Sequence, residues 1–499
     1  MISVNEALAH RLELVSPLEA EMVPLAEAAG RVLARDVSAR RDQPPFSASA
    51  MDGYAVKGAE VELHAMFKVV GEAAAGHRFD GVVGAGQAVR IFTGAPIPEG
   101  AGFVVIQEDV TRKGNLITIT DEPGDGDNIR PRGGDFFDGD TVSAPRRLSQ
   151  LGLTARGGAD PLISDLVVDS RKVGEGALFV ALPGSTVHGA NFIPAALAEG
   201  AAAILTDAAG AELSTGALAE SHAALIVVED PRQVLAFTAA LWFGAQPQTM
   251  VAVTGTNGKT SVSTFVRQIW MAMGYEAVNL GTTGVEGAWS YPLAHTTPEP
   301  ITLHRALAAA ASAGVTHAAM EASSHGLDQR RLDGVELAAA GFTNLSQDHL
   351  DYHHTFEEYF AAKAGLFRRV LPEEGVAVIN MDDPRGAEMR AIAAARGQEV
   401  ITIGRGLGDL SLVGQRYDGT GQDIRFSWHD RPFMARLNLI GGFQAENVLM
   451  ACGLVIASGE EPERVFETLG ELTTVRGRMQ LAATRENGAS VFVDYAHTP

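Results

Sequence analysis

Short apolar segments alternate with alanine-rich amphipathic stretches from about residue 147 onward. The segments DLVVDS, ALFVAL, AAAILT and AALIVVED have the length of buried strands, and helical stretches separate them. This alternation is typical of a parallel sheet covered by helices. It continues with larger spacing from Thr249 to about Leu412, and a further unit begins near Arg416. The pattern predicts a multidomain α/β protein.

The first part of the chain has a different pattern. Residues 1 to about 40 are expected to form helices joined by a short extended piece. Residues 66–120 contain short β-rich runs interrupted by Gly and Pro, which predict a small β-domain. The following segment, DEPGDGDNIRPRGGDFFDGD, is dense in Gly, Asp and Pro and is predicted to be a loop.

Composition and charge exclude several classes of protein. The 499 residues carry a net charge of -22, which argues against binding to duplex nucleic acid. The single cysteine, Cys452, excludes an internal disulfide framework and a multi-cysteine zinc site. The start lacks the apolar region of a signal peptide, and no stretch is apolar enough to span a bilayer. A cytoplasmic protein without a membrane partner is expected.

The clearest chemical motif is TMVAVTGTNGKTSVSTFVRQIWMAMG. Residues 250–253 are predicted to form a buried strand, residues 255–260 a glycine loop, and the following residues a helix that ends at Gly274. Such a loop directs backbone N–H groups at phosphates, while Lys259 adds a charge and the Thr260 hydroxyl can bind Mg²⁺. Val253 stands where the general motif has its first Gly. A glycine-rich turn with an exposed lysine is the alternative.

Three further residues are candidates for metal binding or catalysis. Glu321 follows an apolar run at the expected C-terminal rim of the sheet, where ligands bind, and His349 follows a second such run. Each could equally be an ordinary residue of a strand end or a turn. Lys363 lies in a predicted helix beside a stripe of apolar residues. The pattern alone favours a lysine whose stem lies along the helix surface.

The order of these motifs along the chain resembles that of a known enzyme family. TGTNGKT, HTTPE, MEASSHGLDQRR, NLSQDHLDYH and YFAAKAGLF follow one another as in the Mur ligases, and within them as in the branch that adds the third residue of the peptidoglycan stem peptide. The resemblance runs from about residue 147 to the end. It implies a UDP-substrate-binding domain at 147–235, an ATP-binding parallel-sheet domain at 236–412 and a truncated C-terminal domain at 413–499.

The resemblance also implies roles for individual residues. The implied catalytic residues are Lys259, Glu321, His349 and Lys363. ATP contacts are implied for Gly255, Thr256, Asn257, Gly258, Lys259, Thr260, Ser261, Asn447, Arg478 and Asp494. The UDP-substrate is expected at Val168, Ser170, Thr296, Thr297, Ser323, Gln329 and Arg331. Mg²⁺ is expected at Thr260, Glu321, His349 and Lys363, the last as a carbamate. That role replaces the surface interpretation of Lys363.

The implied reaction is an ATP-dependent ligation. The D-Glu carboxylate of UDP-MurNAc-L-Ala-D-Glu attacks the γ-phosphate of ATP, and the amine of a diamino acid then attacks the acyl phosphate. Diaminopimelate is preferred over lysine only because it is commoner in the family. The segment that reads this amino acid is expected beyond Pro499. Gln444 stands where the family usually has a second adenine-side Asn.

The segment before residue 146 resembles a second family. VPLAEAAGRVLARDVSA, PPFSASAMDGYAV and RIFTGAPIPEGAGFVVIQED are similar to the start of molybdopterin molybdenumtransferases, with Asp52 and Thr93 at positions that this family uses near its active site. Both residues also suit simple turns, because each precedes a Gly. The larger cofactor-binding domain of that family does not follow. The segment at 1–145 is therefore expected to be an incomplete appendage, and self-association through it is an open option.

Several functional alternatives remain at this point. The chain could be a natural fusion or an artefact of joining two truncated genes near residue 146. It could have a molybdenum-cofactor role, or it could bind nucleotide and UDP-substrate without turnover. A folylpolyglutamate synthetase has a similar phosphate loop, but the SRKV…LFVALPG segment favours a UDP-substrate.

Overall fold

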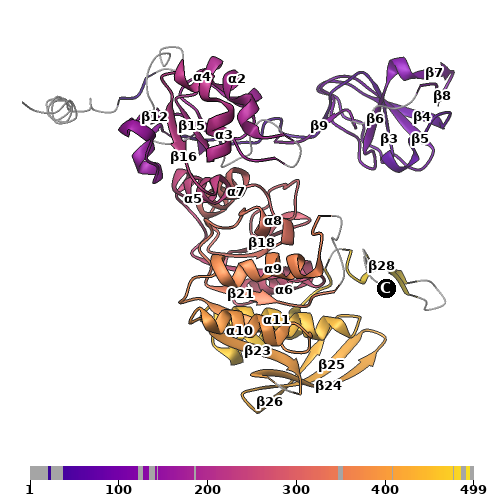
Figure 1. The fold of residues 1–499 in the computed structure, drawn as a ribbon. Coiled ribbons are helices and arrows are strands. Elements are labelled where there is room, and N and C mark those ends of the chain that lie inside the picture. Colours follow the sequence, from indigo (N-terminus) through magenta and orange to yellow (C-terminus); the bar gives the residue numbers. More distant parts are fainter. Residues whose placement is uncertain are drawn as a thin grey trace, which may run out of the picture. The chain divides into compact units, whose positions relative to one another are not determined.

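The computed structural model in Figure 1 describes most of the chain. The described residues are 21–23, 37–121, 127–133, 141–142, 144–184, 187–346, 352–406, 408–475, 477–484 and 490–494. The helices expected at the start of the chain lie largely outside these ranges. The contacts divide the chain into two units, which are Met1–Val37 with Val142–Glu229, and Ser38–Thr141 with Asp230–Pro499. Each is described by itself.

The β-rich segment predicted at residues 66–120 is confirmed as a six-stranded sheet with the order β6-β3-β5-β4-β8-β7. Its strands are β3 (Gly53–Val56), β4 (Met66–Ala73), β5 (Gln87–Ile91), β6 (Phe103–Ile106), β7 (Val110–Lys113) and β8 (Leu116–Ile119). Alternate residues bury both faces, with Tyr54 and Val105 in one cluster and Ala55 and Val104 in the other. This alternation is expected for paired strands whose successive side chains point to opposite faces.

The predicted loop at 121–140 is not entirely irregular. Its described part contains the two-residue strand β9 (Ile129–Arg130), which pairs antiparallel with β2 (Ala48–Ser49). The side-chain amide of Asn128 also donates to the carbonyl of Val104 at 2.9 Å. These contacts supply hydrogen-bond partners that a sequence dense in Gly and Asp does not reveal. Two further short strands, β1 (Val37–Ser38) and β10 (Thr141–Val142), lie where the chain passes between the units.

The unit containing residues 142–229 has the parallel sheet that the four apolar segments predict. The sheet has the order β13-β14-β15-β16, and every pairing in it is parallel. Its elements are β13 (Leu166–Val167), β14 (Leu178–Val180), α2 (Ile193–Ala198), β15 (Ala203–Thr206), α3 (Ala208–Leu213), α4 (Thr215–Ala219) and β16 (Ala224–Val227). A short antiparallel pair, β11 (Arg146–Arg147) with β12 (Leu162–Ile163), precedes it.

The largest sheet has ten strands in the order β19-β18-β20-β17-β21-β22-β23-β24-β25-β26. The strands are β17 (Thr249–Thr254), β18 (Ala277–Gly281), β19 (Gly284–Gly287), β20 (His317–Glu321), β21 (Ala339–Phe342), β22 (Val376–Asn380), β23 (Glu399–Arg405), β24 (Leu410–Asp418), β25 (Gly421–Trp428) and β26 (Arg431–Leu437). In this order, every pairing from β18 to β24 is parallel, whereas β19 at one edge and β25 and β26 at the other are added by antiparallel pairing.

Helices cover both faces of this sheet (Figure 1). Val251 and Val253 of β17 are buried in a cluster with residues of α6 and α11, whereas Met250 and Ala252 are buried against α7, α9 and α10. A strand buried on both faces has a continuous run of apolar residues, as β17 has at residues 250–253. The helices are α5 (Pro231–Phe243), α6 (Lys259–Ala272), α7 (Pro300–Ser312), α8 (Ser324–Asp328), α9 (Phe356–Gly365), α10 (Gly386–Ala395), α11 (Phe443–Ala457) and α12 (Pro462–Glu467).

The predicted division between residues 412 and 413 falls inside strand β24. This strand pairs with β23 through Leu412 and continues its pairing with β25 beyond it. The antiparallel strands therefore extend the central sheet, and the domain limits taken from the sequence stay a prediction. The last described element is a hairpin of β27 (Gln480–Thr484) and β28 (Ser490–Val493). Among the described residues, no helix has the length and apolarity needed to cross a membrane.

Candidate functional site

The glycine loop at residues 255–260, called the phosphate loop from here on, joins β17 to α6. This confirms the predicted strand, loop and helix. Gly258 precedes the helix with φ +90°, a conformation that L residues other than Gly rarely adopt. The Lys259 ammonium donates to the backbone carbonyls of Gly255 and Thr256, each at 2.8 Å. The lysine is thus folded back over its own loop, where it can contact an anion at the N-terminus of α6.

Two residues after β21 fix the conformation of this loop. Asn344 Oδ1 accepts the backbone N–H of Asn257 at 2.9 Å, and the Thr343 hydroxyl donates to the Asn257 carbonyl at 2.6 Å. The Thr256 backbone N–H donates to the carbonyl of Asn344 at 2.9 Å. Sequence reasoning missed Thr343 and Asn344 as site residues. The signal was present, because they directly follow an apolar run that was predicted to be a strand.

Asn447 in α11 packs against the phosphate loop. Its Oδ1 lies 2.6 Å from the position that a Cβ would occupy at Gly258. Its Nδ2 donates to Oε1 of Gln444 at 3.2 Å, and Gln444 is buried. The structure therefore brings the predicted adenine-side Asn to the loop, with Gln444 as its neighbour one helical turn earlier.

Glu321 is the last residue of β20, and its side chain is 1% exposed. Its Oε2 accepts the Thr260 hydroxyl at 3.1 Å, which joins the carboxylate to the phosphate loop. Its Oε1 accepts the backbone N–H of Thr282 at 3.0 Å, and Thr282 was not foreseen from the sequence. The rim position predicted for Glu321 is confirmed. A buried carboxylate held by hydroxyl and backbone donors provides hard oxygen ligands of the kind that Mg²⁺ prefers.

The threonines expected to bind the UDP-substrate continue this network. The Thr282 hydroxyl lies 3.1 Å from the Thr296 hydroxyl. The Thr297 hydroxyl donates to the backbone carbonyl of Glu321 at 2.9 Å and accepts the backbone N–H of Ser323 at 3.1 Å. Glu321 is therefore flanked by the phosphate loop on one side and by the candidate substrate residues on the other.

Arg331 and Gln329 lie beside Thr297. Arg331 Nη1 donates to the Thr297 carbonyl at 2.6 Å, and Nη2 donates to Gln329 Oε1 at 2.8 Å. Burial lowers the pKa of Arg331, but the guanidinium keeps its charge. Gln329 Nε2 also donates to the hydroxyl of Tyr352 at 3.2 Å, and burial raises the pKa of that phenol. The structure thus places a cation and several hydrogen-bonding groups where an anionic substrate group could bind.

Lys363 is buried, with 1% of its side chain exposed. Its ammonium donates to the carbonyl of Gly255 at 2.7 Å and lies 4.5 Å from the ring centroid of Tyr359. The Tyr359 hydroxyl is in turn 3.1 Å from the hydroxyl of Thr256. The helical pattern favoured a lysine on the protein surface. This prediction is wrong, because the face of α9 that carries Lys363 packs against the phosphate loop.

The remaining predicted residues are placed less completely. His349 lies outside the described residues. Ser261 is buried in the first turn of α6. Asp494 accepts the backbone N–H of Met479 at 3.2 Å, and Arg478 donates its own backbone N–H to Val475. In the unit containing residues 142–229, Val168 is exposed and Ser170 half-buried, directly after the C-terminal end of β13. These positions are compatible with ligand contacts and do not test them.

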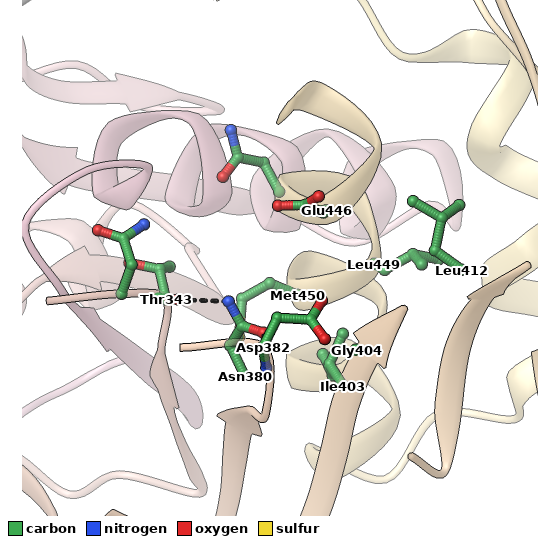
Figure 2. Close-up of a pocket in the computed structure, with 11 residues that line it drawn as sticks. Thr343, Asn380, Asp382, Ile403, Gly404, Leu412, Glu446, Leu449 and Met450 are labelled. Carbon is green, nitrogen blue, oxygen red and sulfur yellow. Dashed lines mark hydrogen bonds between the residues drawn. The ribbon is translucent and has the colours of Figure 1, made fainter. Parts of the chain in front are cut away.

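A pocket opens at the C-terminal ends of β22 and β23, beside the phosphate loop (Figure 2). Amide and carboxylate side chains line one part of it, and apolar side chains of α11 and the strands line the rest. The lining residues are Thr343, Asn344, Asn380, Asp382, Ile403, Gly404, Leu412, Glu446, Asn447, Leu449 and Met450. Three of them, Thr343, Asn344 and Asn447, also contact the loop.

In the β-rich segment, Asp52 and Thr93 contact one another as expected for neighbouring site residues. Asp52 Oδ1 accepts both the backbone N–H and the hydroxyl of Thr93, each at 2.8 Å. These hydrogen bonds lower the pKa of Asp52. The contact joins positions 41 residues apart, so it is a tertiary contact between two loops and not the local turn that the Gly after each residue suggested.

Comparisons with known protein families match the first part of the chain to one family and the rest to another. The Mur ligase middle domain matches residues 253–455, the catalytic domain of the Mur ligase family matches residues 162–242, and the MoeA N-terminal region (domain I and II) matches residues 2–155.

Relatives match over two thirds of the chain. A UDP-N-acetylmuramoyl-L-alanyl-D-glutamate--2,6-diaminopimelate ligase of Rhizobium meliloti is 46% identical over 339 residues, 68% of each chain. One of Caulobacter vibrioides is 44% identical over 347 residues, 68% of this chain and 70% of the relative. A solved structure of a ligase with the same name has a TM-score of 0.58 and 31% identity, and covers 68% of both chains. The chain belongs to the Mur ligase family.

Proposed function

We propose that this chain is an ATP-dependent ligase that joins a diamino acid, meso-diaminopimelate, to the D-Glu residue of UDP-MurNAc-L-Ala-D-Glu during peptidoglycan synthesis. One observation carries the proposal. Glu321 accepts the hydroxyl of Thr260 on the phosphate loop and the backbone N–H of Thr282, whose hydroxyl contacts Thr296. A nucleotide phosphate and a substrate carboxylate held by these elements would meet beside one carboxylate.

The phosphate loop would hold the triphosphate of ATP. Lys259 would turn from the carbonyls of Gly255 and Thr256 toward the β- and γ-phosphates and neutralise their charge. Thr260 and Glu321 would hold Mg²⁺ through oxygen atoms, and the ion would supply further neutralisation of the phosphoryl oxygens. His349 and a carbamate on Lys363 are the remaining proposed ligands.

The substrate would bind on the other side of Glu321. Thr296, Thr297 and Arg331 would orient its muramoyl-peptide part, so that the D-Glu carboxylate faces the γ-phosphate of ATP. The carboxylate oxygen forms a bond to phosphorus as the bond to the ADP oxygen breaks. The diamino acid's amine then attacks the acyl carbon, phosphate leaves, and the amine proton passes to solvent.

The test measures ADP release and amide formation with the full chain, ATP, Mg²⁺, UDP-MurNAc-L-Ala-D-Glu and meso-diaminopimelate. The expected result is one ADP per amide, with no product from UDP-MurNAc-L-Ala or without the diamino acid. Lysine in place of diaminopimelate tests the choice of amino acid. Absence of both turnover and dipeptide-substrate binding in a folded chain would overturn the proposal. Substrate and nucleotide binding without amide formation would establish the binding-only alternative instead.

A second candidate role concerns the β-rich segment. The match to the MoeA N-terminal region favours binding of a molybdenum cofactor or its precursor, and Asp52, which Thr93 orients, is the candidate contact. Fluorescence titration of the full chain with molybdopterin tests it, with Asp52→Asn as the comparison. Equal binding by both proteins would exclude a role for this carboxylate, and the absence of binding would exclude the candidate.

A further inference from the structure

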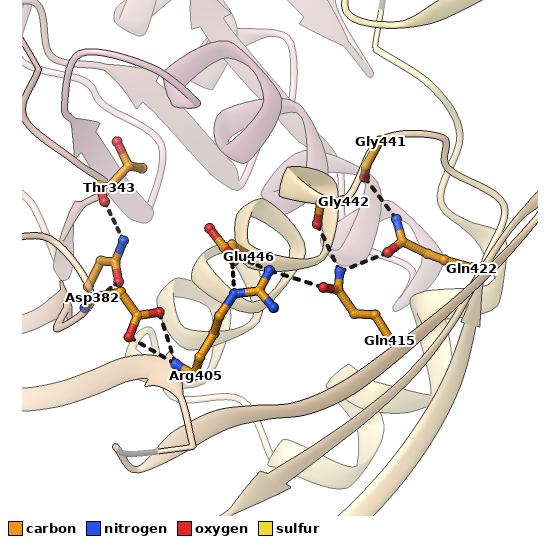
Figure 3. A network of polar contacts seen from close by, with 9 residues as sticks. Thr343, Asp382, Arg405, Gln415, Gln422, Gly441, Gly442 and Glu446 are labelled. Atoms are coloured by element: carbon orange, nitrogen blue, oxygen red, sulfur yellow. Dashed lines mark hydrogen bonds and ion pairs between the residues drawn. The ribbon is translucent and has the colours of Figure 1, made fainter.

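The polar contacts in Figure 3 centre on Arg405, the last residue of β23. Its backbone N–H donates to both carboxylate oxygens of Asp382, at 3.0 and 2.9 Å. Asp382 follows β22 and donates its own N–H to Oδ1 of Asn380 at 3.0 Å. The base of the arginine side chain is thus fixed to the ends of two neighbouring strands.

The guanidinium of Arg405 reaches α11. Its Nε and Nη2 contact Oε1 of Glu446 at 2.8 and 2.6 Å, and Nη2 also donates to Oε1 of Gln415 at 3.0 Å. About half of the arginine side chain is exposed. A simple ion pair at such a position contributes little to stability. A planar fork that engages two acceptors fixes geometry in addition, which a lysine cannot reproduce.

Two glutamines continue the contact to the start of α11. Gln415 Nε2 donates to the carbonyl of Gly442, the residue before the helix, at 2.8 Å and to Gln422 Oε1 at 3.0 Å. Gln422 Nε2 donates to the carbonyl of Gly441 at 3.0 Å. The first turn of α11 is therefore fixed at Glu446 through Arg405 and at its beginning through the glutamines.

This arrangement determines which way Asn447 points. Consecutive residues of a helix are rotated by about 100°, so a rotation of α11 at Glu446 would move Asn447 with it. Asn447 lies against Gly258 of the phosphate loop. At the other end of the chain of polar contacts, Asn380 Nδ2 donates to the carbonyl of Thr343 at 2.6 Å, and the Thr343 hydroxyl donates to the loop carbonyl of Asn257. The polar chain thus begins and ends at the phosphate loop.

We propose that Arg405 is a positioning residue for the nucleotide, acting through Glu446 to hold Asn447 over the phosphate loop. The inference rests on the proposed function, because it takes the bound molecule to be ATP. Arg405 does not itself line the pocket beside the loop, whereas Asp382 and Glu446, its two carboxylate partners, do. Arg405 is thus required to place the groups that bind the nucleotide, and it is not required for binding of the UDP-substrate.

The experiment compares the full chain with Arg405→Lys, Glu446→Gln and the double variant. ADP affinity is measured by calorimetry, and KM is measured separately for ATP and for UDP-MurNAc-L-Ala-D-Glu. Each single variant is expected to weaken ADP binding and raise KM for ATP about three- to tenfold, with KM for the UDP-substrate unchanged. The double variant is expected to have about the same ADP affinity and KM for ATP as either single variant, because both substitutions remove the same contact between Arg405 and Glu446.

Arg436→Lys is the matched control. Arg436 forms a similar forked pair with Asp418, at 2.7 and 2.8 Å, but between strands β26 and β24 and not with α11. It should leave ADP affinity unchanged. Equal ADP affinity in wild type and Arg405→Lys, or an equal rise of both KM values, would overturn the inference alone. Failure of the folded wild type to bind ADP would overturn the proposed function together with this inference.

Discussion

The backbone N–H of Thr282 donates to Oε1 of Glu321 at 3.0 Å, while the Thr282 hydroxyl lies 3.4 Å from the same oxygen. Thr282 follows β18 and Glu321 ends the adjacent parallel strand β20. The carboxylate is therefore oriented by a neighbouring strand end before any ligand binds. Gly281 leaves room for it, since a Cβ there would collide with the carboxylate.

Replacement of Thr282 by Val tests this orientation. The variant keeps the backbone N–H but loses the hydroxyl contacts to Thr296 and Glu321. We expect the Mg²⁺ concentration for half-maximal activity to rise about three- to tenfold, since a typical hydrogen bond contributes roughly 0.5–1.5 kcal/mol. Thr282→Ser is the control and should behave like wild type. A Mg²⁺ dependence of Thr282→Val equal to that of wild type would contradict the assignment.

Gly258→Ala is predicted to abolish measurable nucleotide binding. The residue has φ +90°, and a Cβ would lie 2.6 Å from Asn447 Oδ1. Backbone strain alone costs about 1–3 kcal/mol. Gly274→Ala is a matched control, because Gly274 has φ +93° with no atom near its Cβ position. It should lower the melting temperature in a similar way and leave ADP affinity unchanged. Calorimetric titration with ADP distinguishes the two, and equal ADP affinity for both variants would refute the steric argument.

Lys363→Met tests the buried lysine. Methionine fills a similar volume but can neither bond to Gly255 nor form a carbamate. We expect turnover to fall by about a hundredfold or more, in the range seen when a group that orients a metal or a reactant is removed. Loss of wild-type activity in CO₂-depleted buffer, restored by bicarbonate, would separately support the carbamate. Full turnover by a folded Lys363→Met protein would show that the lysine is only structural.

His304 in α7 predicts a pH dependence of stability. Burial lowers its pKa from 6.5 to about 4. Neither ring nitrogen has a hydrogen-bond partner among the described residues. The unfolded chain binds a proton at His304 more readily than the folded chain does. The free energy of unfolding is therefore unaffected by this histidine well above pH 6.5 and decreases as the pH falls toward 4. The loss at pH 5 is about 2 kcal/mol.

His304→Leu should remove that part of the pH dependence. Thermal unfolding at pH 7.5 and pH 5 measures it, with His295→Gln at an exposed position as the control. The fall in melting temperature between the two pH values should be smaller for His304→Leu than for wild type. An unchanged fall would show that His304 does not stay neutral in the folded chain.

The sequence predicted the parts of this molecule in which local pattern and tertiary environment agree. The strand at 249–254 has a continuous apolar run at 250–253 because it is buried on both faces, and the glycine loop has a recognisable spacing. Glu321 was predicted at the sheet rim because it directly follows an apolar run, and the C-terminal ends of parallel strands meet at the edge of the sheet where ligands bind. The roles of the predicted site residues as ligand contacts remain predictions.

Long-range contacts could not be predicted from local pattern. Lys363 has the sequence environment of a surface residue, yet α9 packs it against a loop 108 positions earlier in the chain. Thr282 contacts Glu321 only because β18 and β20 are neighbours, although α7 separates them in sequence. Similarly, the change in sequence pattern near residue 412 does not show that β24 pairs with β23 in the central sheet.

One edge of the ten-stranded sheet has a consequence for aggregation. Strand β26 forms this edge and β19 the other, and the exposed residues of β26 include Arg431 and Pro432. Proline has no N–H to offer an incoming strand, and a charged residue at an edge opposes pairing with another molecule. The antiparallel strands that lengthen the central sheet therefore also oppose edge-to-edge aggregation at the edge that β26 forms.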